Sequence, residues 1–109
     1  MSIEAARLKR HDEALDRKAE ALVGRAVEQS RLFAETLIEI KVKRRGKLWR
    51  SFPDHPLVAA ARMSGERALE AWGGVANFFH MHGAYKGEER AEATMMDISE
   101  TLVELEGLG

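Results

Sequence analysis

The 109-residue sequence contains no cysteine and only two prolines. Without cysteine the chain has no disulfide framework and no thiol chemistry. Aromatic residues make up 6% of the chain and β-branched residues are few, so little in the composition favours a sheet. No stretch is long and apolar enough to span a bilayer, and the charged N-terminal residues do not fit a signal peptide. We therefore expect an all-α, cytoplasmic protein without membrane contact.

Charge is abundant but unevenly distributed. Charged residues make up 32% of the chain and nearly cancel to a net charge of −1. Residues 1–52 carry thirteen Lys/Arg against eight Asp/Glu, whereas residues 53–109 carry four against ten. Such a split indicates a basic surface that faces an anion, or a basic-to-acidic contact between molecules. Alternatively, folding brings the two halves together and they neutralise each other.

A helical pattern runs without proline from about residue 3 to residue 45. Its seven-residue repeat has Leu15, Leu22 and Gln29 in one column, and Ala19, Ala26, Phe33 and Ile40 in the other. Gly24 is the weak point, since glycine costs about 1 kcal/mol relative to alanine inside a helix. We favour a continuous helix over a hairpin near residues 23–25, because no cap residue or proline is close. A helix of about 60 Å would overhang a compact domain of this size, so its seam would need a partner.

The rest of the chain predicts two further helical regions in the same single domain. A basic and aromatic connection at 46–55 begins at a glycine, where helices commonly end. The next helical region spans about 56–82, with Pro56 in the favoured first position. We expect the pair Gly73–Gly74 to break or kink this region, which gives three or four helices in total. The C-terminal helix spans about 88–106.

The apolar stripes of the first and last helices are typical of a helical bundle or coiled coil. The last stripe has spacings of 4, 3, 4 and 3 residues and is the cleaner of the two. We expect these stripes to join copies of the chain in a homo-oligomer. The predicted interface residues are Leu15, Leu22, Phe33, Leu37, Ile40, Met95, Ile98, Leu102 and Leu105.

The densest positive charge lies where the first helix ends. The predicted nucleic-acid-binding residues are Lys41, Lys43, Arg44, Arg45, Lys47 and Arg50. Cations at this density neutralise phosphates, and Trp49 among them could stack on a base. The competing interpretation is a solvated helix C-terminus, where cations complement the helix dipole. In that case Trp49 and Phe52 fill the core.

Patterns for catalysis, cofactors and metals are absent. His80 and His82 flank one residue, a spacing that suits metal ligands only in an extended segment, and no HExxH pattern supports them. The carboxylates of the last helix lie opposite its apolar stripe, on a solvated surface rather than in a cleft. The serines show no nucleophile motif. We therefore predict no catalytic residues, no metal site and no cofactor.

Three functions remain as expectations. The first is a non-catalytic, oligomeric helical adaptor of the DNA-packaging or nucleoid type, which presents its basic surface to nucleic acid. The alternative is a regulator or inhibitor that binds a protein through its apolar seams and its acidic half, without nucleic acid. The third is a small helical enzyme with a pocket lined by Arg and Lys.

Overall fold

The fold is all-helical. The computed structural model describes the backbone of residues 3–44 and 56–106 and the side chains of residues 13–42 and 56–106. Its helices are α1 (Ile3–Arg44), α2 (Pro56–Met81) and α3 (Tyr85–Glu106). The prediction of an all-α fold is confirmed, and the described segments contain three helices rather than four. Within the residues that the structure describes, no helix combines the length and apolarity needed to cross a bilayer.

Helix α1 is continuous over 42 residues. It passes through Gly24, and a hairpin at residues 23–25 is not formed. A Cβ atom added at Gly24 would meet nothing within 4 Å, so this glycine lies on an open part of the helix surface. Its cost to the helix is therefore only the conformational entropy of glycine.

Helix α2 corrects the expectation for Gly73–Gly74, because this pair neither ends the helix nor starts a fourth one. Glycine can adopt helical backbone angles, and its entropic cost of about 1 kcal/mol is small beside the burial of its neighbours. Val75 and Ala76 directly after the pair are buried, and Trp72 before it is half-buried. The packing of these neighbouring side chains thus outweighs the low helix propensity of the two glycines.

A tight turn joins α2 to α3. Gly83 has a φ of +72°, a left-handed conformation that favours glycine. The Ala84 amide donates to the Phe79 carbonyl at 2.8 Å, so the end of α2 is satisfied within the turn. Helix α3 begins at Tyr85, three residues earlier than predicted, and includes Gly87. A Cβ at Gly87 would lie 2.8 Å from the Phe79 ring, so this glycine provides room for packing rather than a turn.

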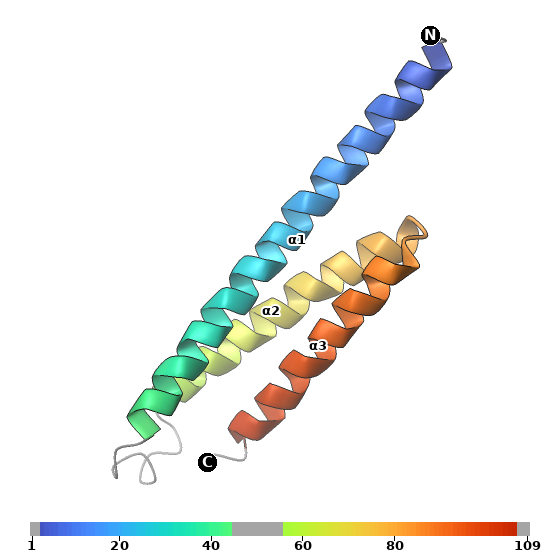
Figure 1. The fold of residues 1–109 in the computed structure, drawn as a ribbon. Helices are drawn as coiled ribbons and strands as arrows, with labels where there is room; N and C mark the ends of the chain where they lie inside the picture. The colour runs from blue at the N-terminus through green and yellow to red at the C-terminus, as the bar shows by residue number, and fades with distance from the viewer. Residues whose placement is uncertain (1–2, 45–55, 107–109) are drawn as a thin grey trace.

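Helix α2 is the centre of the arrangement. Helices α1 and α3 both pack along it, yet no Cα atom of α1 lies within 8 Å of one of α3 (Figure 1). The N-terminal part of α1 extends well past the turn between α2 and α3 (Figure 1). The molecule is accordingly long and thin, with extents of 70 × 18 × 16 Å.

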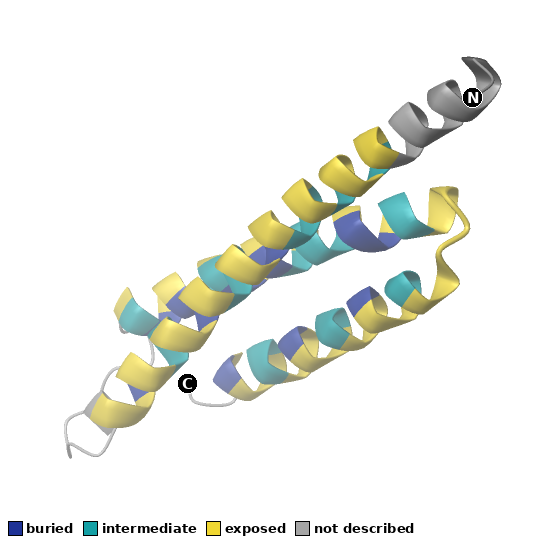
Figure 2. Cartoon of the chain, turned by 45° about the horizontal axis from the view of Figure 1, so that its top comes forward, coloured by how far each residue is buried: buried dark blue, intermediate teal, exposed yellow. Residues whose placement is uncertain are grey.

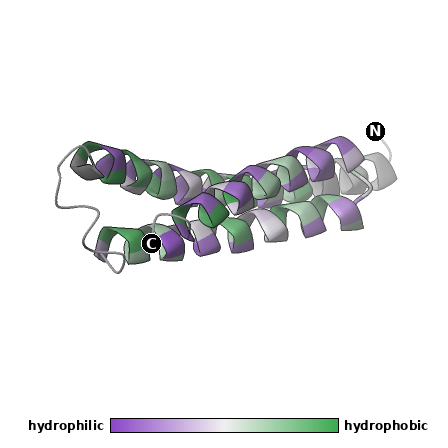
Figure 3. Cartoon of the chain, turned by 90° about the horizontal axis from the view of Figure 1, so that it is seen from below, coloured by the Kyte–Doolittle hydropathy of each residue, from purple (hydrophilic) through white to green (hydrophobic). Residues whose placement is uncertain are grey.

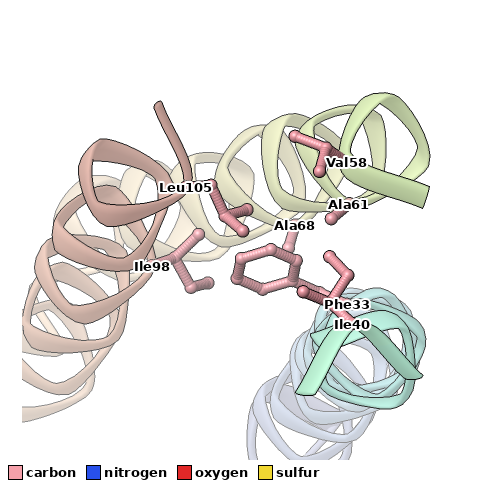
Figure 4. Close-up of a cluster of buried hydrophobic side chains, with 7 residues drawn as sticks. All are labelled: Phe33, Ile40, Val58, Ala61, Ala68, Ile98 and Leu105. Carbon is pink, nitrogen blue, oxygen red and sulfur yellow. The ribbon is translucent and has the colours of Figure 1, made fainter. Parts of the chain in front are cut away.

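Two apolar clusters hold the helices together. The first, shown in Figure 4, contains Phe33, Ile40, Val58, Ala61, Ala68, Ile98 and Leu105. The second contains Ala26, Val75, Ala76 and Ala91. Between them the Trp72 indole N–H donates to the Ser30 hydroxyl at 2.7 Å, which satisfies a partly buried donor. Figure 3 shows hydrophobic positions on all three helices, alternating with hydrophilic ones.

Candidate functional site

The basic end of α1 is the predicted nucleic-acid surface. Lys41 lies near the end of α1 with an exposed side chain, and it forms no ion pair with any described side chain. The other predicted cations are Lys43, Arg44, Arg45, Lys47 and Arg50, and their side chains lie outside the described residues. The same holds for Trp49 and Phe52. The structure therefore describes Lys41 and the backbone of α1 up to Arg44.

The C-terminal end of α3 lies at the same end of the molecule as the C-terminal end of α1 (Figure 1). Glu100, Glu104 and Glu106 are all exposed. Among the described side chains, ion pairs form within α1 or between α2 and α3, and none joins α1 to the acidic half. Among the described side chains at this end, Lys41 forms no ion pair with these glutamates.

Arg31 forms a small charge network on the surface of α1. Its guanidinium donates to Glu28 and also to Glu35 at 2.5 Å, and all three side chains are more than half exposed. The hydrogen bond from Arg31 lowers the pKa of Glu28. The same hydrogen bond raises the pKa of Arg31. These one-turn pairs support the helix, and they leave Arg31 surrounded by compensating charge.

The predicted oligomer-interface residues contribute to the interior of a single chain. Phe33, Ile40, Ile98 and Leu105 are buried in the first cluster. The half-buried members Leu22, Leu37, Met95 and Leu102 pack against one cluster or the other. Leu15 is half-buried and belongs to neither cluster. The stripes that the sequence reveals most strongly thus join α1 and α3 to α2.

A different set of apolar side chains is exposed on α1. Val27 is 52% exposed, Ile38 60% and Val42 64%, and Ala34 between them is exposed as well. Figure 2 shows a continuous run of exposed positions along α1. Sequence reasoning passed over these residues because Arg31 interrupts their pattern. Their spacings of seven, four and four residues, which place apolar side chains on one side of a helix, were the available signal.

Groups suited to catalysis or metal binding do not gather in the described part of the chain. No polar or charged residue there is buried, and no three His, Asp or Glu side chains lie close enough to share a metal ion. His80 Nδ1 lies 3.0 Å from a Glu88 carboxylate oxygen, which links the end of α2 to the start of α3. The Arg62 Nε atom is buried and has no hydrogen-bond partner.

Comparison with known proteins adds no relative. A search finds no protein-family model, no curated protein and no solved structure that matches this chain. The fold and surface by themselves define a class: an elongated all-α protein in which α1 and α3 both pack along α2, and their side chains share one apolar cluster.

Proposed function

We propose that this protein is a non-catalytic, oligomeric helical adaptor that presents the basic end of α1 to nucleic acid. The observation that carries the proposal is the exposed Lys41 side chain, which lies in the helix that leads into the densest positive charge of the sequence. That end belongs to an elongated molecule in which the backbones of α1 and α3 are not in contact. Both features suit a protein that works by contact with other macromolecules.

The expected mechanism is electrostatic. Each Lys or Arg that neutralises a phosphate releases condensed counterions, and this release favours binding without regard to base sequence. Oligomerisation would present several basic ends at once, which raises the effective concentration of the second contact. The helix dipole opposes this effect slightly, because its C-terminus is the negative end. Several cations together outweigh it.

Removal of the basic cluster tests the nucleic-acid contact. In fluorescence anisotropy with a short DNA duplex at about 50 mM salt, the variant Lys43/Arg44/Arg45/Lys47→Ala should bind at least about 100-fold more weakly than wild type. The slope of log affinity against log salt should also become shallower, by about 0.9 for each phosphate that the variant no longer neutralises. Lys41 is retained, so the described surface of α1 stays unchanged.

The matched control removes four exposed cations elsewhere, as Arg25/Arg67/Lys86/Arg90→Ala. This variant has the same net charge as the test variant and should bind DNA far more tightly than the test variant does. Equal losses of affinity in the two variants would show that only net charge matters. Absence of binding by the wild type would overturn the nucleic-acid proposal outright.

A protein-binding regulator is the second candidate, and exposed apolar side chains on α3 favour it. Met96 is 65% exposed and Val103 67% exposed, seven residues apart on one side of the helix. Met side chains adapt well to varied partners. This candidate predicts no affinity for DNA and a stoichiometric complex with one protein.

A further inference from the structure

Helix α1 carries a second heptad seam that no described part of its own chain covers. The seam consists of Glu20, Gly24, Val27, Arg31, Ala34, Ile38 and Lys41, which we call the outer seam. Its spacings are 4, 3, 4, 3, 4 and 3 residues, so at about 100° per residue all seven positions follow one side of the helix. Every one of them is exposed. The buried residues Ala26, Phe33 and Ile40 belong to a separate row.

The outer seam has opposite charges at its two ends and apolar side chains between. Glu20 is at the N-terminal end and Lys41 at the C-terminal end, while Val27 and Ile38 are the large apolar members. When a second copy of the seam runs antiparallel to the first, its lysine end lies beside the glutamate end of the first seam. Its apolar side chains then lie beside the apolar side chains of the first. A parallel copy would instead place Glu20 against Glu20 and Lys41 against Lys41, which is unfavourable.

We propose that a second copy of this chain covers the outer seam, with the two α1 helices antiparallel about a two-fold axis near residues 32 and 33. Val27 then faces Ile38 of the second copy, and the symmetry repeats the contact. This inference rests on the oligomeric part of the proposed function. It assigns the contact to residues different from the apolar stripes of the sequence, which pack inside the chain.

Small residues leave room for this pairing. In the proposed register Lys41 of the second copy crosses α1 at Gly24, where a Cβ atom would meet nothing within 4 Å. Glu20 lies one turn away, about 6 Å along the helix axis, within reach of the flexible lysine. In the dimer Lys41 therefore contributes to the pairing, and the phosphate contacts fall to the cations that follow it in the sequence, which the DNA-binding test removes. Arg31 faces Ala34 of the second copy. Its charge is already compensated by Glu28 and Glu35 on the same helix.

The self-complementary pattern identifies a second copy, rather than an unrelated protein, as the occupant. An isologous two-fold contact requires each surface to match its own reverse, and the outer seam meets this condition in charge and in apolar character. The exposed apolar pair also fits burial against itself: Val27 and Ile38 are 52% and 60% exposed in the single chain. The burial of Val27 against Ile38 of the second copy would provide the hydrophobic contribution to the free energy of dimerisation.

Cysteine cross-linking tests the orientation, because the natural sequence contains no cysteine. Val27→Cys and Ile38→Cys chains, mixed and mildly oxidised, should form a mixed disulfide dimer, since facing positions come within bonding distance. Each variant alone should cross-link little. A mixture of Ala21→Cys and Glu39→Cys, both exposed positions off the seam, is the matched control. Cross-linking of each single variant with itself, at the expense of the mixed dimer, would mean a parallel pair and overturn the proposal.

Charge exchange tests the same contact without a covalent bond. Glu20→Lys and Lys41→Glu should each raise the Kd of self-association at least about tenfold, and the double variant should restore it. Glu39→Lys makes the same charge change as Glu20→Lys, but at a position off the seam, and should leave the Kd of self-association unchanged. Circular dichroism checks that each variant keeps its helices. A stable oligomer that ignores these changes and yields no mixed disulfide would overturn the outer-seam pairing, while the adaptor proposal would stand on its DNA-binding test.

Discussion

Replacement of Phe33 by alanine should lower the free energy of unfolding by about 3–5 kcal/mol. Phe33 is 4% exposed, and its ring lies among side chains from all three helices (Figure 4). One ring edge lies 3.0 Å from the position that a Cβ of Gly65 would occupy. Because domains of this size have about 5–15 kcal/mol of stability in total, this single loss is a large fraction. Urea unfolding followed by circular dichroism measures it.

Leu32→Ala is the matched control for Phe33. Leu32 is the preceding residue of the same helix and is 39% exposed. Its truncation should cost well under half of the loss seen for Phe33, because less apolar area returns to water. Equal losses at the two positions would contradict the placement of Phe33 in the core. An unchanged stability for both would show that α1 does not pack on α2 through this row.

Gly65→Val should lower the free energy of unfolding by about 2–3 kcal/mol. Side chains from α1 and α3 both reach Gly65 of α2, where an added Cβ would lie 2.6 Å from Leu102 Cδ2 and 3.0 Å from the Phe33 ring. A valine there must displace side chains from two helices at once. The gain in helix propensity over glycine, less than about 1 kcal/mol, offsets only part of this strain. Urea unfolding again provides the measurement.

Gly74→Val makes the same substitution in the same helix at an open position. A Cβ at Gly74 would meet nothing within 4 Å, so only the helix propensity changes there. We expect an effect within about 0.5 kcal/mol, on the stabilising side. A destabilisation at Gly74 as large as that at Gly65 would mean that close packing around Gly65 does not explain the loss of stability in Gly65→Val.

The sequence predicted the helices well because long periodic stripes without proline have few alternative structures. It expected a break or kink at Gly73–Gly74, and a break is wrong, because burial of Val75 and Ala76 outweighs the local preference of glycine. It also began the last helix at about residue 88, although Gly87 lies inside α3 and makes room for the Phe79 ring. Both errors concern glycines, whose role depends on what packs against them.

The sequence was less informative about which surface meets which partner. A heptad stripe has the same appearance whether its partner is another helix of the chain or a second copy. The residues predicted as an oligomer interface include Phe33 and Leu105, which the structure packs into the core. The outer seam was harder to recognise, because Arg31 and Gly24 stand among its apolar members. Only the folded chain shows that the stripe containing Phe33 is buried and that the outer seam is exposed.

The mass of the wild-type protein in solution tests the central claim most directly. Helices α2 and α3 leave the outer seam of α1 uncovered in one chain, and we propose that a second copy covers it. Multi-angle light scattering does not depend on molecular shape, which matters for a molecule with extents of 70 × 18 × 16 Å. At micromolar concentration we expect a mass of twice 12.2 kDa. A mass of 12.2 kDa that persists as the concentration rises would contradict the account.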